Sequence, residues 1–176
     1  NSYFEATRTD SLGSELEGLG SIAGQGAGTL DTIYSDVILV NKTRNTGGFI
    51  GNLRQAKAPL DVVNCWYDGE ISGTQWIGGI LGFVDAGTAY ANITDCLVTA
   101  DMTATTSEKH SYLGGLAARA TIGTFASCVV AGELTGPGLV RGLIGMSVTK
   151  PEQELILAKC YNATNVESHY NTALEQ

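Results

Sequence analysis

The sequence predicts an all-β fold: a right-handed parallel β-solenoid of about five turns, with 27 to 36 residues in each turn. Three observations carry this prediction. The four cysteines recur at a nearly constant interval, and a glycine-rich element recurs between them. Within each repeat, apolar and polar residues alternate with a period of two, which is typical of β-strands.

The cysteine element is the most regular of the three. Cys65, Cys96, Cys128 and Cys160 follow one another at intervals of 31, 32 and 32 residues. An apolar residue stands three positions before each cysteine, another follows directly, and a third stands six positions after it. An earlier copy, TIYSDVILVN, places Ser35 in the position of the cysteine. Five copies of this element are therefore expected.

The glycine element also occurs five times, as GSIAG at 20–24, GGFIG at 47–51, GGILG at 78–82, GGLAA at 114–118 and RGLIG at 141–145. Glycine within a strand lets neighbouring backbones approach closely, as in a solenoid with a thin interior. The alternative is consecutive hairpins in a sandwich or propeller-like array. It fits less well, because the glycine elements lack the Asn-Gly or Asp-Gly turns of hairpins.

Alternation assigns the side chains to two faces. From Cys65 onward, every second residue is small or apolar and is expected to point inward, while Trp66, Asp68 and Glu70 are expected to point outward. Strands of successive turns would pair in parallel, roughly 4.8 Å apart. Residues 18–167 then form the repeat domain, residues 1–17 an N-terminal cap or assembly arm, and residues 168–176 a polar C-terminal tail.

The composition excludes several classes of partner. A net charge of −8 and a pI near 4.6 argue against nucleic acid and against anionic membrane surfaces. No apolar run approaches 18 residues, so we expect no membrane insertion. The chain begins at Asn1 without Met or a signal peptide, so we expect either a processed secreted protein or a fragment of a longer one.

The two elements together resemble the GLUG-motif repeat, named for a Gly-Leu-any-Gly core. The resemblance covers roughly residues 18–166 and is best in WIGGILGFVDAGTAYANITDCLVTADMTA at 76–104. The chain departs from the pattern at Ser35 and at the insertion TKPEQE before the last cysteine strand. Such repeats occur in large bacterial and archaeal surface proteins and beside the protease domains of some secreted IgA-cleaving enzymes. The resemblance implies an extracellular or cell-surface β-solenoid stalk or binding module and no catalytic residue.

Three sets of residues are candidate chemical sites. The cysteines would form a ladder of inward thiols, which we interpret as core residues, with disulfides between neighbouring turns or a metal or redox site as alternatives. Outward carboxylates at Glu70, Asp101 and Glu133 would stack in register, either solvated or bridged by Ca²⁺, the one cofactor considered. N-glycosylation motifs occur at Asn41, Asn92 and Asn162.

A fourth set is an outward apolar column one residue after each cysteine, formed by Trp66, Leu97, Val129 and Tyr161. Such a stripe is long for a soluble monomer. It would be covered by the N-terminal segment or a loop, or would contact a partner subunit or a sugar ring. In residues 1–17, Tyr3 and Phe4 are the apolar residues that would dock an assembly arm on a second copy.

The function that these observations favour is a non-enzymatic extracellular structural protein. It would be a stalk or adhesin module, or a fibre subunit that binds itself head to tail or by strand exchange. On the arm model, deletion of residues 1–17 would abolish assembly. The second hypothesis is a carbohydrate-binding module that contacts a surface glycan or protein. A glycan-cleaving β-helix enzyme is a distant third, because only the isolated Arg119 and Arg141 suggest it.

Overall fold

The computed structural model describes residues 18–53, 56, 58–84, 90–106, 110–148 and 153–168, together with the backbone of residues 5–8. Every regular element in these residues is a β-strand. The strands belong to three parallel sheets, which we call the main sheet, the glycine sheet and the third sheet. The all-β prediction is therefore confirmed.

The main sheet contains eleven strands, which include the residues that follow each cysteine. They are β1 (Glu5–Arg8), β4 (Tyr34–Ser35), β5 (Ile38–Gly47), β8 (Trp66–Tyr67), β9 (Glu70–Gly78), β12 (Leu97–Val98), β13 (Asp101–Ala104), β14 (Tyr112–Gly114), β17 (Val129–Gly136), β18 (Leu139–Arg141) and β21 (Tyr161–Ser168).

The glycine sheet and the third sheet contain five strands each. The glycine sheet consists of β2 (Ala23–Gln25), β6 (Ile50–Asn52), β10 (Leu81–Val84), β15 (Ala117–Ala120) and β19 (Ile144–Ser147). The third sheet consists of β3 (Gly28–Asp31), β7 (Leu60–Val63), β11 (Ala91–Thr94), β16 (Gly123–Ala126) and β20 (Leu155–Ala158).

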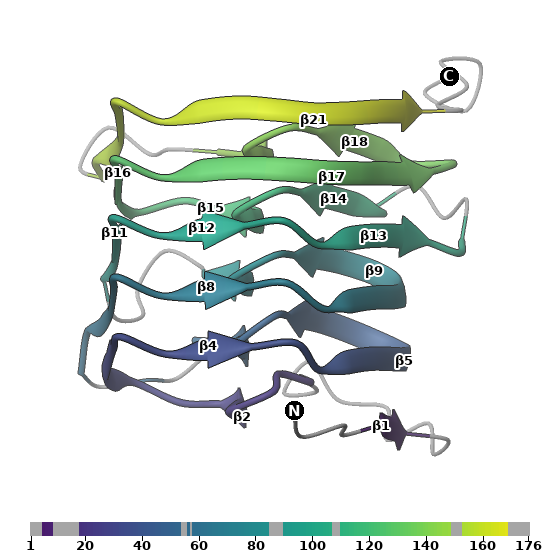
Figure 1. Cartoon of the computed structure of the whole chain (residues 1–176), viewed down its shortest axis with the longest axis horizontal. Helices are drawn as coiled ribbons and strands as arrows, with labels where there is room; N and C mark the ends of the chain where they lie inside the picture. Colours follow the sequence, from purple (N-terminus) through teal and green to yellow (C-terminus); the bar gives the residue numbers. More distant parts are fainter. Residues whose placement is uncertain are drawn as a thin grey trace.

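The chain winds through these sheets as a right-handed solenoid. It passes from the glycine sheet to the third sheet and then to the main sheet, and each strand pairs in parallel with its counterpart one turn later. Figure 1 shows the chain running left to right along the near face, returning along the far face, and rising from the N-terminal to the C-terminal end. Five strands in each smaller sheet correspond to about four complete turns, close to the expected five.

Strand register confirms the alignment of the glycine elements and corrects one part of the cysteine alignment. Ala23, Ile50, Leu81, Ala117 and Ile144 stand at the same position of the five glycine elements and pair in one column. Tyr34, however, pairs with Trp66. The residue equivalent to Cys65 in the first copy is therefore Ile33, and the assignment of Ser35 to that position is wrong by two residues.

Each turn has a left-handed corner between the third sheet and the main sheet. The residue before the cysteine position has φ between 53° and 55° in all five copies: Thr32, Asn64, Asp95, Ser127 and Lys159. Asn and Asp tolerate this conformation better than other residues with a side chain, and Thr does so poorly. The corner recurs even where Thr, Ser or Lys fills it, so the solenoid geometry overrides the local preference.

The core follows the predicted alternation. Cys65, Tyr67 and Ile71 are buried, while Trp66 and Asp68 between them are exposed. Glycines form the opposite wall. A Cβ at Gly79 would lie 2.3 Å from the Gly115 carbonyl oxygen and 2.6 Å from a methyl carbon of Val98, so the two walls touch there without room for a methyl group. The thin interior expected from the glycine content is thus observed.

The two ends of the solenoid differ. At the N-terminal end, β1 pairs in parallel with β5, joining Glu5–Arg8 to Ile38–Asn41. At the C-terminal end, β19, β20 and β21 each pair with one neighbour only, within the part of the chain that the structure describes. Residues 5–8 therefore lie against their own chain, where a cap would lie. Tyr3 and Phe4 fall outside the described residues.

Candidate functional site

The cysteine ladder consists of free thiols bonded to the backbone. Cys65, Cys96 and Cys128 are buried and Cys160 is half-buried. Each Sγ donates to the carbonyl two residues earlier and to a carbonyl of the preceding turn. For Cys128 these are Ala126 at 3.2 Å and Ile93 at 3.4 Å. A hydrogen bond with the Cys96 thiol, together with burial, raises the pKa of Cys128, and burial raises the pKa of Cys160. The same hydrogen bond lowers the pKa of the Cys96 thiol. The four thiols are free and pack in or against the core.

The outward apolar column lies where the alternation placed it, and it begins one turn earlier than predicted. Tyr34, Trp66, Val129 and Tyr161 are exposed and Leu97 is half-buried. Parallel pairing stacks all five in register. The position of Tyr34 was missed because the first copy was aligned on Ser35. Alignment on the apolar residue three positions before the cysteine would have found it, since Leu30 pairs with Val62.

Trp66 combines an aromatic contact with a chain of polar groups in this column. Its ring meets Tyr34 edge to face with the ring centroids 4.9 Å apart. Its Nε1 donates to Thr99 Oγ1 at 2.8 Å, and the Thr99 hydroxyl donates to Asp68. Exposed aromatic faces beside hydroxyl and carboxylate groups can pack against a sugar ring and bond its hydroxyls.

The acidic column is in register as predicted. Asp101 pairs with Glu70, and the Glu133 backbone N–H donates to Asp101 Oδ1 at 2.9 Å. All three residues are exposed. In the described part of the chain, no group of three or more His, Cys, Asp and Glu side chains is arranged to hold a metal ion. The stacking of these residues supplies the hydrogen bond from the Glu133 N–H to Asp101. The geometry does not support the hypothesis of a bridging Ca²⁺ ion.

The three glycosylation motifs differ in accessibility. Asn41 is only 2 % exposed, and its Nδ2 donates to Arg44 O at 3.2 Å and Thr46 Oγ1 at 3.0 Å, so this amide is buried and hydrogen-bonded in the folded chain. Asn92 is half-buried and donates to Asp61 at 2.7 Å. Asn162 is exposed despite its inward parity, because it belongs to the last strand.

A second aromatic cluster was not predicted. Trp76 and Phe83 stack with centroids 4.9 Å apart and an interplanar angle of 14°. The guanidinium carbons of Arg44 and Arg119 lie 5.7 Å and 5.3 Å from the Trp76 and Phe83 rings respectively. The signal was present in WIGGILGF, whose sharp glycine turn brings the two rings together. Arg119 is thus a packing partner of Phe83, and the exposed Arg141 lies on β18.

The comparisons with known proteins add no relative. No family model, no curated protein and no solved structure matches the chain. The resemblance to GLUG repeats therefore stays a hypothesis that rests on the motifs quoted above. No helix long and apolar enough to cross a bilayer occurs in the described residues. Function must be argued from the geometry of the chain itself.

Proposed function

We propose that this chain is a non-enzymatic structural module of an extracellular or cell-surface protein, either a stalk or a repeating unit of a fibre. The observation that carries the proposal is the repetition of the same contacts from turn to turn. Inward columns pack, ladders run through all five strands of the smaller sheets, and a thiol bonds to backbone carbonyls in four of the five copies. Such an arrangement sets length and shape, as repeat architectures do.

The proposed location outside the cell rests on two supports. One is the resemblance of the glycine and cysteine elements to GLUG repeats, which occur in surface proteins. The other is the charge of −8, which disfavours adhesion to nucleic acid and to anionic lipid. A surface stalk has to stay unbound to these polyanions while it projects from the cell.

Carbohydrate binding is the second candidate, and the surroundings of Trp66 favour it. The exposed Tyr34–Trp66 pair, with Thr99 and Asp68 beside it, offers an aromatic platform and hydrogen-bonding groups on one face of the main sheet. A glycan bound there would make the module an adhesin. Both candidates place no chemistry on the chain beyond binding.

Two measurements test these proposals. Antibody labelling of intact source cells should detect the protein without permeabilisation, and incubation with a polysaccharide panel should release no product. Detection only after permeabilisation, or turnover of any polysaccharide, contradicts the structural role. On a glycan array, Trp66→Ala should lose any retention that Val129→Ala keeps, because Val129 is exposed in the same column and has no ring. Equal retention by both variants contradicts the carbohydrate site.

A further inference from the structure

The C-terminal end of the solenoid is an open cross-section of its core. In the column Leu30, Val62, Ile93, Phe125 and Leu157, the three middle residues are fully buried, whereas Leu157 is 48 % exposed. In the column Leu39, Ile71, Met102, Leu134 and Val166, the first four are at most 1 % exposed and Val166 is 40 % exposed. Among the described residues, apolar positions and unpaired strand edges therefore meet on one surface, which is unusual for an isolated chain.

The N-terminal end carries the matching surface, partly closed. Leu30 and Ile33 are half-buried there, and the outer edges of β2, β3 and β4 have no strand beside them among the described residues. Leu39 is fully buried although it lies in the first turn. It is covered where β1 pairs with β5. One end of the molecule is thus open, and the other is closed only at β5.

We propose that the open C-terminal end receives the N-terminal end of a second copy of this chain, head to tail, and that β1 is a plug that must leave β5 first. This inference rests on the proposed structural function and names its partner. The copies would continue the solenoid, with Leu157, Cys160 and Val166 of one copy meeting Leu30, Ile33 and Leu39 of the next.

The strand register defines the junction. Between neighbouring turns of the main sheet, Tyr34 pairs with Trp66 and Val129 with Tyr161, both separated by 32 residues. Continuing the ladder places Tyr161 opposite Tyr34 of the next copy and Asn165–Ser168 opposite its Ile38–Asn41. Residues Ile38–Asn41 are the residues that β1 occupies. The plug and the second half of β21 therefore compete for one edge.

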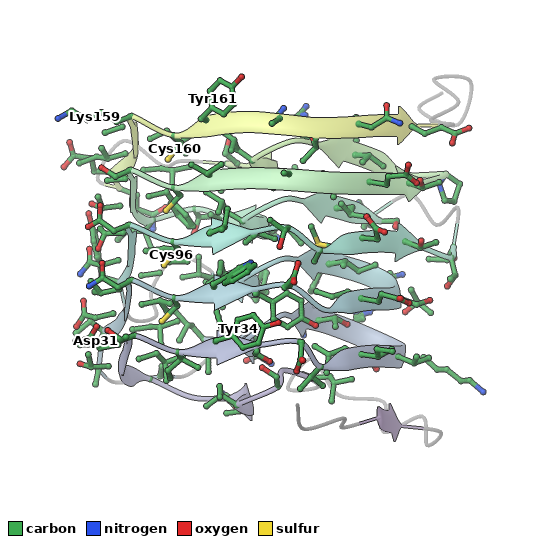
Figure 2. The ribbon with its side chains drawn as sticks, in the orientation of Figure 1. Asp31, Tyr34, Cys96, Lys159, Cys160 and Tyr161 are labelled. Carbon is green, nitrogen blue, oxygen red and sulfur yellow. The ribbon has the colours of Figure 1, made fainter. Side chains whose placement is uncertain are left out.

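Charge and ring chemistry agree with this alignment. Lys159 at the C-terminal end and Thr32 at the N-terminal end occupy the same left-handed corner, and Asp31 adjoins Thr32. Lys159 and Asp31 are both exposed. Figure 2 shows Lys159 above Asp31 and Tyr161 above Tyr34 along the stacking direction. In a junction, the ammonium and the carboxylate would meet at one corner, and the two tyrosines would extend the aromatic column.

The plug, β1, is poorly suited to pair with a strand of another chain and can dissociate from β5. β1 has four residues, and its ends are Glu5 and Arg8. Short strands with charged residues at a sheet edge discourage pairing with another chain. With β1 in place, the main sheet extends one strand further than the glycine and third sheets at this end. The end of a second copy cannot pair with the projecting β1 and with β2 to β4 at the same time. Assembly therefore requires that β1 first dissociates from β5.

The test compares the 176-residue chain with a variant lacking residues 1–17, by sedimentation velocity and electron microscopy. The deletion should lower the concentration at half-assembly about tenfold or more, if β1 occupies β5 in nine molecules out of ten. The assemblies should have the width of one solenoid. Thr7→Pro in the 176-residue chain, which removes a backbone donor from β1, should act in the same direction. Circular dichroism confirms that both variants keep the fold.

Charge reversal distinguishes head-to-tail contact from other association. In the chain without residues 1–17, Lys159→Asp alone and Asp31→Lys alone should each raise the concentration at half-assembly several-fold, because like charges would meet at the corner. An equimolar mixture of the two variants should restore assembly, since every junction then joins opposite charges. Restoration fails if the ends do not meet at this corner.

The proposal is overturned by a folded chain without residues 1–17 that stays monomeric up to millimolar concentration. This includes the case in which residues 169–176 close the C-terminal end in cis. Loss of assembly on the deletion, as an assembly arm would require, overturns it too. Neither result touches the structural role, because a stalk needs no second copy. That role fails separately, on polysaccharide turnover or intracellular labelling.

Discussion

At the scale of single residues, each cysteine and the left-handed residue before it together form the corner between the third sheet and the main sheet. The corner ends the ladder of the third sheet, and the thiol then donates to the carbonyl two residues earlier, at 3.1 Å in Cys65 and Cys96. The same carbonyl also accepts a backbone N–H from the preceding turn, Thr32 to Val63 at 3.0 Å and Asn64 to Thr94 at 3.2 Å, so the thiol is its second donor. Cysteine suits the position because it is small, apolar and able to donate weakly.

The first prediction concerns thiol reactivity. A thiol reagent should modify one cysteine in the folded chain, Cys160, because Cys65, Cys96 and Cys128 are buried. The reaction should be slower than with free cysteine, since the raised pKa of Cys160 lowers its thiolate fraction. Cys160→Ser should leave no reactive thiol, and denaturant should expose all the thiols that remain. Modification of Cys96 or Cys128 at the rate of Cys160 would contradict the buried ladder.

The second prediction is a loss of stability at alkaline pH. Burial raises the pKa of Tyr67, and the Cys128 and Cys160 thiols also have raised pKa values in the fold. In the unfolded chain the pKa of cysteine is about 8.5 and that of tyrosine about 10. Above these values the unfolded chain releases protons that the folded chain keeps, so the free energy of unfolding falls as pH rises. The contribution is fully present below about pH 8.

Urea unfolding at pH 7 and at pH 9.5 measures this effect. The urea midpoint should be lower at pH 9.5, and Cys160→Ala should reduce the difference between the two midpoints, because it removes a thiol whose pKa burial raises. Val129→Ala serves as the control, since Val129 is exposed and carries no titratable group, so it should not change the difference between the two midpoints. A midpoint that does not move between the two pH values contradicts the assignment.

The alternation of the sequence was sufficient to assign side chains to inside and outside. It worked for Cys65 to Ile71 because the main sheet has one buried face and a period of two. It could not reveal the left-handed corner, since Thr32, Ser127 and Lys159 carry no local preference for that conformation. The misplacement of Ser35 follows from the same gap, because without a cysteine only three-dimensional register fixes the first copy.

At the scale of elements, the paired glycines determine how close the walls of the solenoid lie. Gly48, Gly79 and Gly115 each face the carbonyl of the glycine at the same corner one turn later and an inward side chain of the main sheet. A side chain at these positions would separate the turns. The recurrence of Gly-Gly in sequence therefore reports a packing contact that repeats at every turn.

The third prediction compares two glycines. Gly79→Ala should destabilise the chain by about 3 kcal/mol or more, because its Cβ would overlap backbone that cannot move. Gly26→Ala should be neutral or slightly stabilising, within about 1 kcal/mol, since its Cβ would lie 3.5 Å from Ala23 Cβ and its φ is ordinary. Urea unfolding measures both. Equal effects would show that the corner relaxes.

The register of the elements could be predicted, but their division into three sheets could not. Counting from glycine to glycine aligned Ala23 with Ile50 and Leu81, as the ladders show. The Trp76–Phe83 stack depends on the angle of the turn between β9 and β10, which no residue spacing specifies. Side-chain contacts between elements of one turn are therefore the part that the repeat pattern left open.

At the scale of the whole molecule, the strands of each turn pair only with strands of the turns before and after it, within the described residues. Stability in such an array is close to a sum of equal contributions from the turns and their interfaces. The interior turns are interchangeable in their columns, and only the ends are special. Removal of one interior turn should therefore shorten the solenoid without unfolding it, provided that the inward and outward alternation of side chains is preserved.

The last prediction tests that interchangeability. Deletion of residues 97–128 removes 32 residues and joins Cys96 to Val129, so that Val130 occupies the inward position of Val98 above Tyr67. The variant should unfold cooperatively, with a lower denaturant dependence because less surface is buried, and should be shorter by about 4.8 Å. Small-angle scattering and urea unfolding measure these changes.

Deletion of 97–127 is the matched control. It keeps one more residue, Cys128, after Cys96, which exchanges the inward and outward side chains, so the cooperative transition should be lost. If both deletions lose the cooperative transition, the turns are not interchangeable. The contacts between turns then differ more than their common register indicates.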